Sequence, residues 1–557
     1  MPLNEVVGVV RGYEKIRHTS PRAPPTQLSK ELQTAISGIS TTGWSYDGPE
    51  DDDALHNPDA SDPSFSFFSS RGWANISALV FLLVCILSLF CLWPILHYFM
   101  RKPVKTVGFN LGGINATGQV PKLPHMPSLV DKDTPSSAQS RVGTDGKNYN
   151  LVFSDEFNTD GRTFWEGDDP FWEGQDMYYW ATGDFEWYDP QAITTENGKL
   201  VITMTAQNPI NNHNLSYRSG MLTSWNKFCF TTGYVEVSIS LPGSGEIPGF
   251  WPGAWTMGNL GRAGYGATTE GTWPYSYDSC DAGTFPGQID KSGNPLAAAT
   301  SGDKGKPISN LPGQRLSACT CPGEDHPGPS VGVGRSAPEI DILEAQVNKE
   351  LVQGEISQSF QLAPFDKHWA WDNSTPATTI YDPSVTRFNS FKGTELQQSL
   401  SAVTLIDNAN YNDNKYLKYA FEWWSDSKHR DDGYITWFID NEKTWTLTAP
   451  SMGPNTDMEI GQRLVSEEPM YLILNLGMST NFEAPDFNNL KFPAKMYIDY
   501  IRVYQRDDVK DGTTCDPPNY PTSDYINRHP EAYSNANWTT WAQAGYLTPR
   551  NSKYDGC

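Results

Sequence analysis

The chain has 557 residues, which is more than one ordinary domain needs and enough for one large domain with appendages. Its formal net charge of -24 at pH 7 repels polyanions and argues against a DNA or RNA partner. Aromatic residues make up 13% of the chain, a content that suits either a large all-β core or stacking against sugar rings.

The N-terminal part predicts a tail and a membrane anchor. Residues 1–72 are rich in Ser, Thr, Pro, Gly and acidic residues, a composition that buries too little apolar surface to fold, so we expect a disordered tail. Residues 73–100 contain an apolar run of about 24 residues, roughly 36 Å as a helix and enough for a bilayer of about 30 Å. The run is too long and too far from Met1 for a cleaved signal peptide, so we expect a transmembrane signal anchor.

Two rules disagree on the orientation of this anchor. Arg101, Lys102 and Lys105 follow the apolar run, and the positive-inside rule applied locally would keep the C-terminal part in the cytosol. Four N-glycosylation sequons lie downstream, however, at Asn115, Asn214, Asn373 and Asn537. Because long domains translocate despite flanking charge, we expect a single-pass type II protein of the secretory pathway or plasma membrane, with a cytosolic tail and a lumenal or extracellular C-terminal part.

The cysteines support an oxidising compartment. Cys85 and Cys91 lie in the apolar run, and six others follow it, Cys229, Cys280, Cys319, Cys321, Cys515 and Cys557. Six cysteines allow up to three disulfides, whose pairing the sequence leaves open. Cys319-Thr-Cys321 is too tightly spaced for a zinc knuckle and no matching His pair follows, so disulfides are favoured over a metal site and no cofactor is expected.

The sequence of the remainder of the chain predicts a stem, an all-β domain and a C-terminal extension. Residues 101–147 lack a clear period and are interpreted as a stem, residues 148–510 as the domain, and residues 511–557 as a Cys-containing extension. Within the domain, short alternating or β-branched runs recur between turn signals, most clearly at 199–205, 233–240, 416–424, 434–440, 470–475 and 496–504. This pattern predicts a sandwich or barrel. Residues 257–335 are Gly- and Pro-rich, which is typical of large loops on one face.

The sharpest local feature is the run Glu339-Ile-Asp-Ile-Leu-Glu344. In a strand, Glu339 and Asp341 share one face, and strict alternation would bury Glu344 in the core. One extra residue, a β-bulge near Leu343, returns Glu344 to the face of the other two acids. Three acids on one face repel one another, so the pKa of at least one of them should be raised. Glycoside hydrolysis requires such a difference, because one carboxylate attacks the sugar while another keeps its proton and donates it to the leaving oxygen. A solvated acidic face or a calcium site are the alternative interpretations.

This run resembles the active-site signature of glycoside hydrolase family 16 in its bulged, laminarinase-like form. Further segments are similar to that family's core strands, namely Phe153-Ser-Asp-Glu-Phe157, Gly249-Phe-Trp-Pro-Gly-Ala-Trp255, Tyr419-Ala-Phe-Glu-Trp423 and Asp499-Tyr-Ile-Arg-Val-Tyr504. A narrower resemblance is to the fungal β-glucan synthesis-associated proteins of the killer-toxin-resistance group, which serve cell-wall β-1,6-glucan. It rests on long segments such as Trp273-Pro-Tyr-Ser-Tyr-Asp-Ser-Cys280 and Arg315-Leu-Ser-Ala-Cys-Thr-Cys321, and covers roughly residues 148–557.

The resemblance implies a concanavalin-like β-jelly-roll of two curved antiparallel sheets with a glucan cleft. It implies that Glu339 is the nucleophile, Asp341 its helper and Glu344 the general acid/base of a retaining mechanism. The sequence departs from some family members at Ala337, where they carry an aromatic residue.

Three further residues are candidates for substrate binding. Trp251 and Trp255 could stack on sugar rings or fill the core, and His368 could bind sugar or simply lie on the surface.

The sequence is compatible with three functions. A membrane-anchored β-glucan glycosidase or transglycosylase is favoured, because a pure binder has no need for three mutually repelling acids. A non-catalytic glucan-binding scaffold and a calcium-stabilised lectin-like adhesin are the alternatives.

Overall fold

The computed structural model describes residues 69–100, 128–368 and 371–557. The chain divides into two compact units, Met1–Lys102 and Pro103–Cys557. Residues 1–68 of the predicted tail and residues 101–127 of the predicted stem lie outside the described residues.

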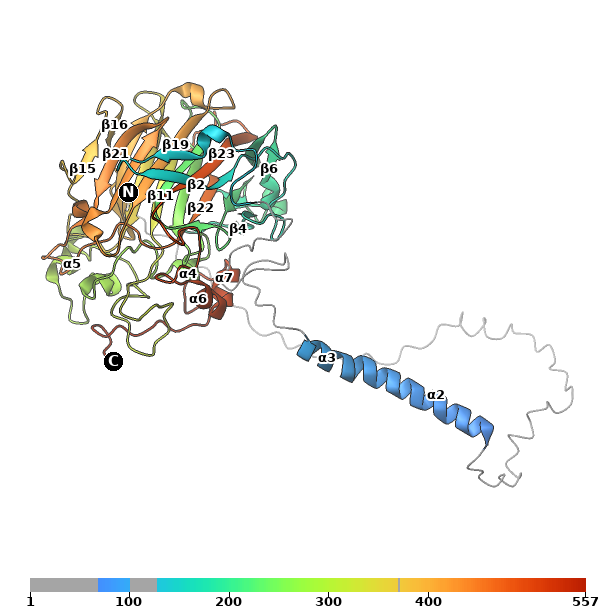
Figure 1. Cartoon of the computed structure of the whole chain (residues 1–557). Coiled ribbons are helices and arrows are strands. Elements are labelled where there is room, and N and C mark those ends of the chain that lie inside the picture. The colour runs from blue at the N-terminus through green and yellow to red at the C-terminus, as the bar shows by residue number, and fades with distance from the viewer. Residues whose placement is uncertain (1–68, 101–127, 369–370) are drawn as a thin grey trace, which may run out of the picture. The chain divides into compact units, whose positions relative to one another are not determined.

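The described part of the first unit is a helical segment (Figure 1). It comprises α2 (Ser70–Leu87), a π-helical turn η2 (Ser88–Leu92) and α3 (Trp93–Met100). The N–H of Trp93 bonds to the carbonyl of Ser88, one residue further back than in an α-helix, just before Pro94, which has no N–H to donate. The stretch Gly72–Leu96 is long and apolar enough to cross a membrane.

The second unit contains two large sheets. The first has 13 strands in the order β15-β21-β20-β19-β11-β23-β7-β8-β5-β4, with β1, β2 and β6 beside this path. Its strands are β1 (Ser140–Val142), β2 (Asn148–Asp155), β4 (Met177–Tyr178), β5 (Glu186–Tyr188), β6 (Ile193–Glu196), β7 (Lys199–Ala206), β8 (Tyr217–Ser219), β11 (Gly233–Ser240), β15 (Thr378–Ile380), β19 (Leu417–Trp424), β20 (Tyr434–Ile439), β21 (Glu442–Thr448) and β23 (Ala494–Arg506).

The second sheet has 10 strands in the order β16-β18-β14-β13-β12-β22-β9-β3, with β10 and β17 beside it. Its strands are β3 (Glu173–Gly174), β9 (Met221–Thr223), β10 (Cys229–Phe230), β12 (Trp251–Gly258), β13 (Glu339–Asn348), β14 (Gln353–Leu362), β16 (Thr386–Phe388), β17 (Gly393–Thr394), β18 (Gln397–Leu405) and β22 (Met470–Gly477). The large strands of both sheets pair antiparallel, so the predicted all-β jelly-roll sandwich is confirmed.

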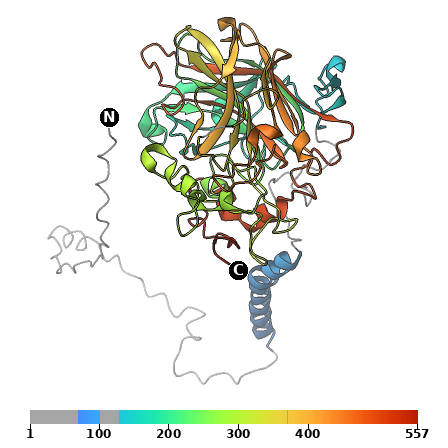
Figure 2. The same cartoon turned by 90° about the vertical axis from the view of Figure 1, so that its left-hand side faces the viewer.

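Short helices and loops gather at one end of the sandwich. The helices are α4 (Gly266–Thr269), α5 (Leu296–Thr300), α6 (Ser523–Arg528) and α7 (Pro530–Ser534). The single 3-10 turns are η3 (Ser136–Ala138), η4 (Pro190–Ala192), η5 (Pro209–Asn211), η6 (Ala282–Thr284), η7 (Pro286–Gln288), η8 (Asp303–Gly305), η9 (Asn408–Asn410), η10 (Arg430–Asp432) and η11 (Ala449–Met452). Figures 1 and 2 show the loop between β12 and β13, drawn in green, beside the dark red C-terminal extension.

Three disulfides hold this end together. They join Cys229 to Cys515, Cys280 to Cys319 and Cys321 to Cys557. The predicted three disulfides are confirmed, and two of them tie the extension to the sandwich or its large loop.

The last residues of the predicted stem pack on the outer face of the first sheet. The strand β1 pairs with β2, and the Arg141 guanidinium lies 3.4 Å from the centroid of the Tyr234 ring. Arg141 also bonds to the buried Glu422 carboxylate at 2.9 Å. Residues 128–147 therefore contribute to the folded domain.

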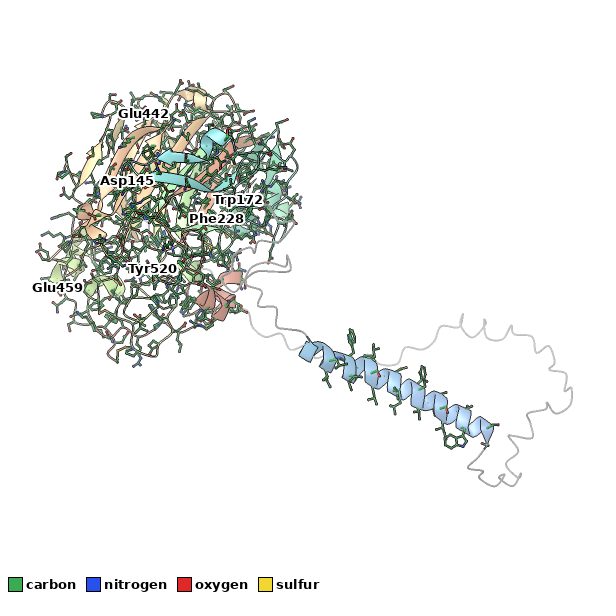
Figure 3. All side chains as sticks on the ribbon, viewed as in Figure 1. Asp145, Trp172, Phe228, Glu442, Glu459 and Tyr520 are labelled. Atoms are coloured by element: carbon green, nitrogen blue, oxygen red, sulfur yellow. A yellow bond between two sulfur atoms is a disulfide. The ribbon has the colours of Figure 1, made fainter. Side chains whose placement is uncertain are left out.

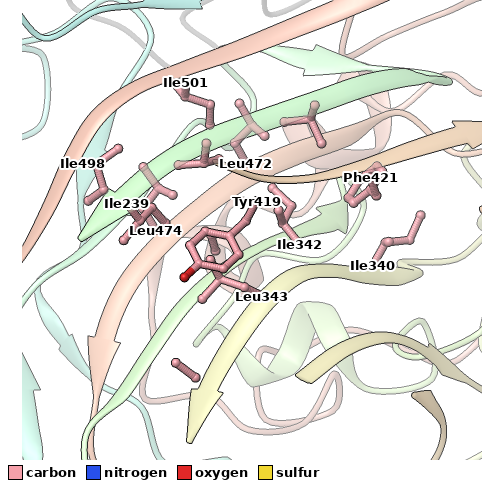
Figure 4. Packing of buried hydrophobic residues seen from close by; sticks show 14 of the residues in the cluster. Ile239, Ile340, Ile342, Leu343, Tyr419, Phe421, Leu472, Leu474, Ile498 and Ile501 are labelled. Carbon is pink, nitrogen blue, oxygen red and sulfur yellow. The ribbon is translucent and has the colours of Figure 1, made fainter. Parts of the chain in front are cut away.

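The main core lies between the two sheets (Figure 4). The first sheet contributes buried side chains such as Ile239, Tyr419 and Ile498, and the second contributes Ile340 and Leu472. The alternation of apolar residues along these strands directs one face of each sheet inward.

The strand β13 carries the bulge that its sequence predicts. The register with β14 shifts between Asp341 and Glu344, where three residue steps on β13 oppose two on β14. Both Ile342 and Leu343 are fully buried in the core. Two consecutive side chains thus point inward, and Glu344 returns to the outward face.

One buried hydrogen bond fixes the start of the bulge from the opposite sheet. Trp437 donates from Nε1 to the backbone oxygen of Asp341 at 2.8 Å. Trp445 stacks on Trp437 with ring centroids 4.2 Å apart, but its Nε1 has no hydrogen-bond partner among the described residues.

We predict that Trp437→Phe lowers the free energy of unfolding by about 1–2 kcal/mol more than Trp445→Phe, because only the first change leaves a buried carbonyl without its donor. Both changes remove similar volume from the same stack, so Trp445→Phe is the matched control. Denaturant unfolding of the detergent-solubilised chain measures the difference, and equal losses would contradict the role of this bond.

Candidate active site

The bulge brings Glu339, Asp341 and Glu344 to one face of the second sheet. On β12, Gly253 lies opposite Glu344 and Trp255 lies opposite Asp341. The intervening Ile342 faces the core, so the three acids share the face that points away from it. The structure therefore brings together the three acids that the sequence singled out.

Each acid has its own hydrogen-bond donor. Trp273 donates from Nε1 to Glu339 Oε2 at 2.5 Å, and Trp251 donates from Nε1 to Glu344 Oε1 at 2.9 Å. Asp341 Oδ2 accepts from Gln361 Nε2 at 3.0 Å, and Asp341 shares a further side-chain hydrogen bond with Glu339. The donors come from different elements, β12, the β12–β13 loop and β14, so each acid has a distinct environment.

Burial dominates the electrostatics of this cluster. It is the largest cause that raises the pKa of Glu339 to about 8 and that of Glu344 to about 7. Burial, and then the charges of Glu339 and Glu344, raise the pKa of Asp341 well above its ordinary value. Because the three groups interact, Glu339, Asp341 and Glu344 lose their protons in coupled steps, and burial favours the states that carry fewer charges.

The two predicted tryptophans differ in their surroundings. Trp251 is half-buried and stacks on Phe482, with ring centroids 4.3 Å apart and planes 2° from parallel. Trp255 is only 9% exposed and donates from Nε1 to Asn475 Oδ1 at 2.8 Å. Trp251 thus borders the acids directly, whereas Trp255 lies in a packed cluster beside them.

Asn475 extends this contact away from the acids. Its Nδ2 donates to the Tyr188 hydroxyl at 3.1 Å, and that hydroxyl donates to Asp184 at 3.1 Å. Burial raises the pKa of Asp184 to about 6. Asp184, a buried acid outside the group of three, is therefore linked to Trp255 through Asn475 and Tyr188.

The predicted candidate His368 lies in the loop after β14. Its side chain is exposed, and its backbone N–H donates to Asp366 Oδ1 at 2.9 Å. The interactions described for His368 are with Asp366 in this loop and with the charge of Asp457 in the segment before β22, and not with the three acids.

Sequence reasoning missed Trp273 and Gln361. Trp273 lies 66 residues before Glu339 in a loop without periodicity, so only its occurrence in a family-like segment could have indicated it. Gln361 could have been found from strand pairing, because it lies directly opposite Glu339 on β14. Among the described residues, no group of three or more His, Cys, Asp or Glu side chains is arranged to hold a metal ion.

The sheets and the acid cluster define the class of the protein, a jelly-roll β-sandwich with a buried carboxylate site on one sheet. The sequence model of the family described as "Beta-glucan synthesis-associated protein SKN1/KRE6/Sbg1" matches residues 42–557. The chain belongs to this family.

Two curated relatives illustrate the similarity. The chain is 44% identical to beta-glucan synthesis-associated protein KRE6 of Saccharomyces cerevisiae, over 91% of this chain and 68% of the relative. It is 42% identical to beta-glucan synthesis-associated protein SKN1 of Candida albicans, over 92% of this chain and 67% of the relative. The chain therefore spans about two thirds of the length of these relatives.

Solved structures with similarity to the chain include two glucanases. The catalytic domain of an endo-1,3-beta-glucanase (laminarinase) from Thermotoga petrophila aligns at 19% identity with a TM-score of 0.37, over 65% of this chain and 100% of that one. An endo-beta-1,3-glucanase from Pyrococcus furiosus aligns at 19% identity with a TM-score of 0.39, over 66% of this chain and 98% of that one.

The raised pKa of Glu344 has a consequence for stability. Its pKa of about 7 in the folded chain lies above its ordinary value of 4.5, so the folded state holds more protons between these pH values. The free energy of unfolding therefore falls as the pH rises through this window.

We predict that Glu344→Gln stabilises the chain by about 2–3 kcal/mol at pH 8 and by much less at pH 4.5, because Gln retains an oxygen for Trp251 and carries no buried charge. Thermal and denaturant unfolding at both pH values measure the effect. The control is Glu442→Gln, an exposed position on β21 (Figure 3), for which we expect no pH-dependent gain. A gain at Glu344 that does not change with pH would contradict this account.

Proposed function

We propose that the jelly-roll domain is a β-glucan glycosidase or transglycosylase that uses a retaining two-carboxylate mechanism in cell-wall β-1,6-glucan biosynthesis. The observation that carries this proposal is the bulge of β13, which holds two glutamates and an aspartate on one face with different donors. Membership of a β-glucan synthesis-associated family supports the substrate class.

In this mechanism Glu339 attacks the anomeric carbon of a glucosyl unit. Glu344 donates its proton to the departing glycosidic oxygen, and a covalent glycosyl-enzyme forms. Glu344, now a carboxylate, then removes a proton from water or from a sugar hydroxyl. That oxygen attacks the anomeric carbon and releases the Glu339 carboxylate.

The surroundings of the acids suit these roles. Glu339 accepts hydrogen bonds from Trp273 and from Asp341, so its ionised form has two donors. Glu344 has one donor, Trp251, and burial raises its pKa to about 7, but the pKa of Glu339 is higher, about 8. The mechanism therefore requires that substrate binding shifts the shared proton from Glu339 to Glu344. Asp341, with its strongly raised pKa, acts as the proton-bearing partner of the nucleophile.

We further propose that Trp251 contacts the sugar, because its half-buried ring borders Glu344. Trp255 acts as a positioning residue through Asn475. Binding of sugar by His368 stays a prediction.

We predict that Glu339→Gln reduces glucan turnover to background, because no other group can form the glycosyl-enzyme, and that Glu344→Gln slows turnover of glucan by about 10²–10⁴-fold. An aryl glucoside with a good leaving group needs no proton from Glu344, so with that substrate Glu344→Gln should accumulate covalent enzyme. Product release and mass spectrometry of fluoro-glucoside-trapped enzyme measure these effects.

The control for both variants is Glu442→Gln, which should retain full turnover. Failure of the active wild-type chain to become labelled at Glu339, or unchanged turnover in Glu339→Gln, would contradict the mechanism. Glucan binding without any turnover would favour a scaffold role instead.

We also propose that residues 73–100 anchor the chain in a membrane of the secretory pathway or the plasma membrane, with residues 1–72 cytosolic and the sandwich lumenal or extracellular. The apolar helix, the three disulfides and the exposed side chains of Asn214, Asn373 and Asn537 in their sequons support this topology.

We predict that endoglycosidase treatment of the full chain increases its gel mobility, and that changing these three Asn residues to Gln reduces the shift. Asn519, which lies outside any sequon, provides the control change to Gln. The proposed orientation would be contradicted if the chain carried no N-glycans and its sandwich were digested by protease added to the cytosolic side of intact vesicles.

A further inference from the structure

One half of the sheet face that carries the acids is covered. The term acid face is used here for the face of the second sheet that bears Glu339, Asp341 and Glu344. From Trp255, which lies opposite Asp341, to the edge of the sheet, the acid-face side chains are at most 9% exposed on β12, β22 and β9, namely Trp255, Met257, Tyr471, Ile473 and Met221. A groove that ran across the whole sheet would leave such side chains open to sugar.

A second hydrophobic cluster covers these side chains, and we call it the flank cluster. It consists of Met177, Tyr188, Met221, Cys229, Trp255, Met257, Ala263, Tyr265, Ala337, Tyr471, Ile473 and Cys515, with Tyr179, Trp225, Trp273 and Ala536 packed against it. Its outer members come from the segment around β4 and β5, from the β12–β13 loop and from the C-terminal extension. The Cys229–Cys515 disulfide lies within it and ties the extension down.

The rim of the flank cluster stands close to the acids. Trp273 donates to Glu339. Burial, and then the charges of Glu339, Asp184 and Asp341, raise the pKa of Tyr179, so its hydroxyl lies within electrostatic range of Glu339. The next residue, Trp180, is 40% exposed. The cluster therefore rises directly beside the site.

The extension meets Trp180 at Gly266 of α4. A Cβ at Gly266 would lie 2.5 Å from the Trp180 indole and 2.8 Å from the backbone of Thr539. Side chain, helix and extension are therefore in contact, and Figure 1 shows α4 beside α7.

The other flank of the acid face, at β14 and β18, carries small polar side chains in place of a hydrophobic cluster. Ser357 and Ser359 on β14 and Ser401 on β18 are nearly fully buried and hydrogen-bond to one another. By contrast, Glu339, Glu344 and Trp251 are all partly exposed. The accessible part of the acid face therefore includes Glu339 and Glu344 on β13 and Trp251 at the start of β12.

We propose that the flank cluster forms a wall that ends the glucan-binding site, so that the protein binds one terminus of a β-glucan chain next to the acids and does not thread an internal segment past them. This inference rests on the proposed function and adds the part of the substrate that is recognised. A terminal glucosyl unit fits against a wall, whereas an internal unit needs an exit on both sides.

The test is binding of linear β-1,3- and β-1,6-gluco-oligosaccharides to the Glu339→Gln chain in detergent, so that turnover does not intervene. The sugars are used free, or with a bulky aromatic cap at the reducing end, the non-reducing end or both. We expect a cap at one particular end to weaken binding at least tenfold and a cap at the other end to change it less than threefold.

Binding of the doubly capped sugar within threefold of the free sugar would overturn the wall. If none of the sugars binds, the proposed function itself fails and the inference falls with it, so the two failures are distinguishable.

A variant of the rim tests the same claim from the protein side. Trp180→Ala in the Glu339→Gln background should reduce the discrimination against the capped end to less than threefold. Trp165→Ala is the matched control, because Trp165 is similarly exposed at 42% but follows Phe164 of the main core, whereas Trp180 follows Tyr179 at the edge of the flank cluster. The control change should leave discrimination unchanged. Full discrimination in a folded Trp180→Ala chain would remove Trp180 from the wall.

Discussion

The site depends on one extra residue in β13. Because Ile342 and Leu343 both enter the core, Glu344 lies on the face of Glu339 and Asp341. Without that residue, period-two alternation would turn Glu344 into an apolar interior, where an isolated carboxylate is strongly unfavourable. The same bulge thus determines which side chains of β13 enter the core and which acids share the opposite face. Trp437 donates a hydrogen bond to the backbone oxygen of Asp341, where the bulge begins.

The surrounding fold offsets an electrostatic cost. Three carboxyl groups in a buried site destabilise the folded chain when they ionise, and the opposing contributions come from the core and from specific donors such as Trp251, Trp273 and Gln361. The β12–β13 loop, which carries Trp273, must therefore keep a fixed position, although it has no regular secondary structure at that residue. The disulfides and the flank cluster supply that restraint at the end of the sandwich where Trp273 lies.

Much of the fold could be predicted from the sequence, because apolar and other residues alternate along its long strands. The six runs expected from the sequence correspond to β7, β11, β19, β20, β22 and β23, within one or two residues at most ends. Strands of two or three residues, such as β3 and β4, carry too little pattern to be recognised.

For the candidate site too, the features set by local sequence could be predicted, and those set by contacts between distant segments could not. The bulge followed from the position of Glu344 relative to the apolar residues around it, which is local information. The contacts of Trp273, the burial of Trp255 and the disulfide partners depend on segments far apart in the chain, and no local periodicity encodes them. The resemblance to a family indicated the segment that contains Trp273 but not its contact with Glu339.

The strand order also bears on how the chain is made. β23 lies between β11 and β7 in the first sheet and pairs with β2 as well, although it comes some 250 residues after β11. During synthesis the edges of β2, β7 and β11 must wait unpaired until residues 494–506 emerge, since no earlier strand fills that gap. Pairing over such separations is slow and leaves open edges prone to aggregation, so maturation of this protein should depend on chaperones that hold nascent chains.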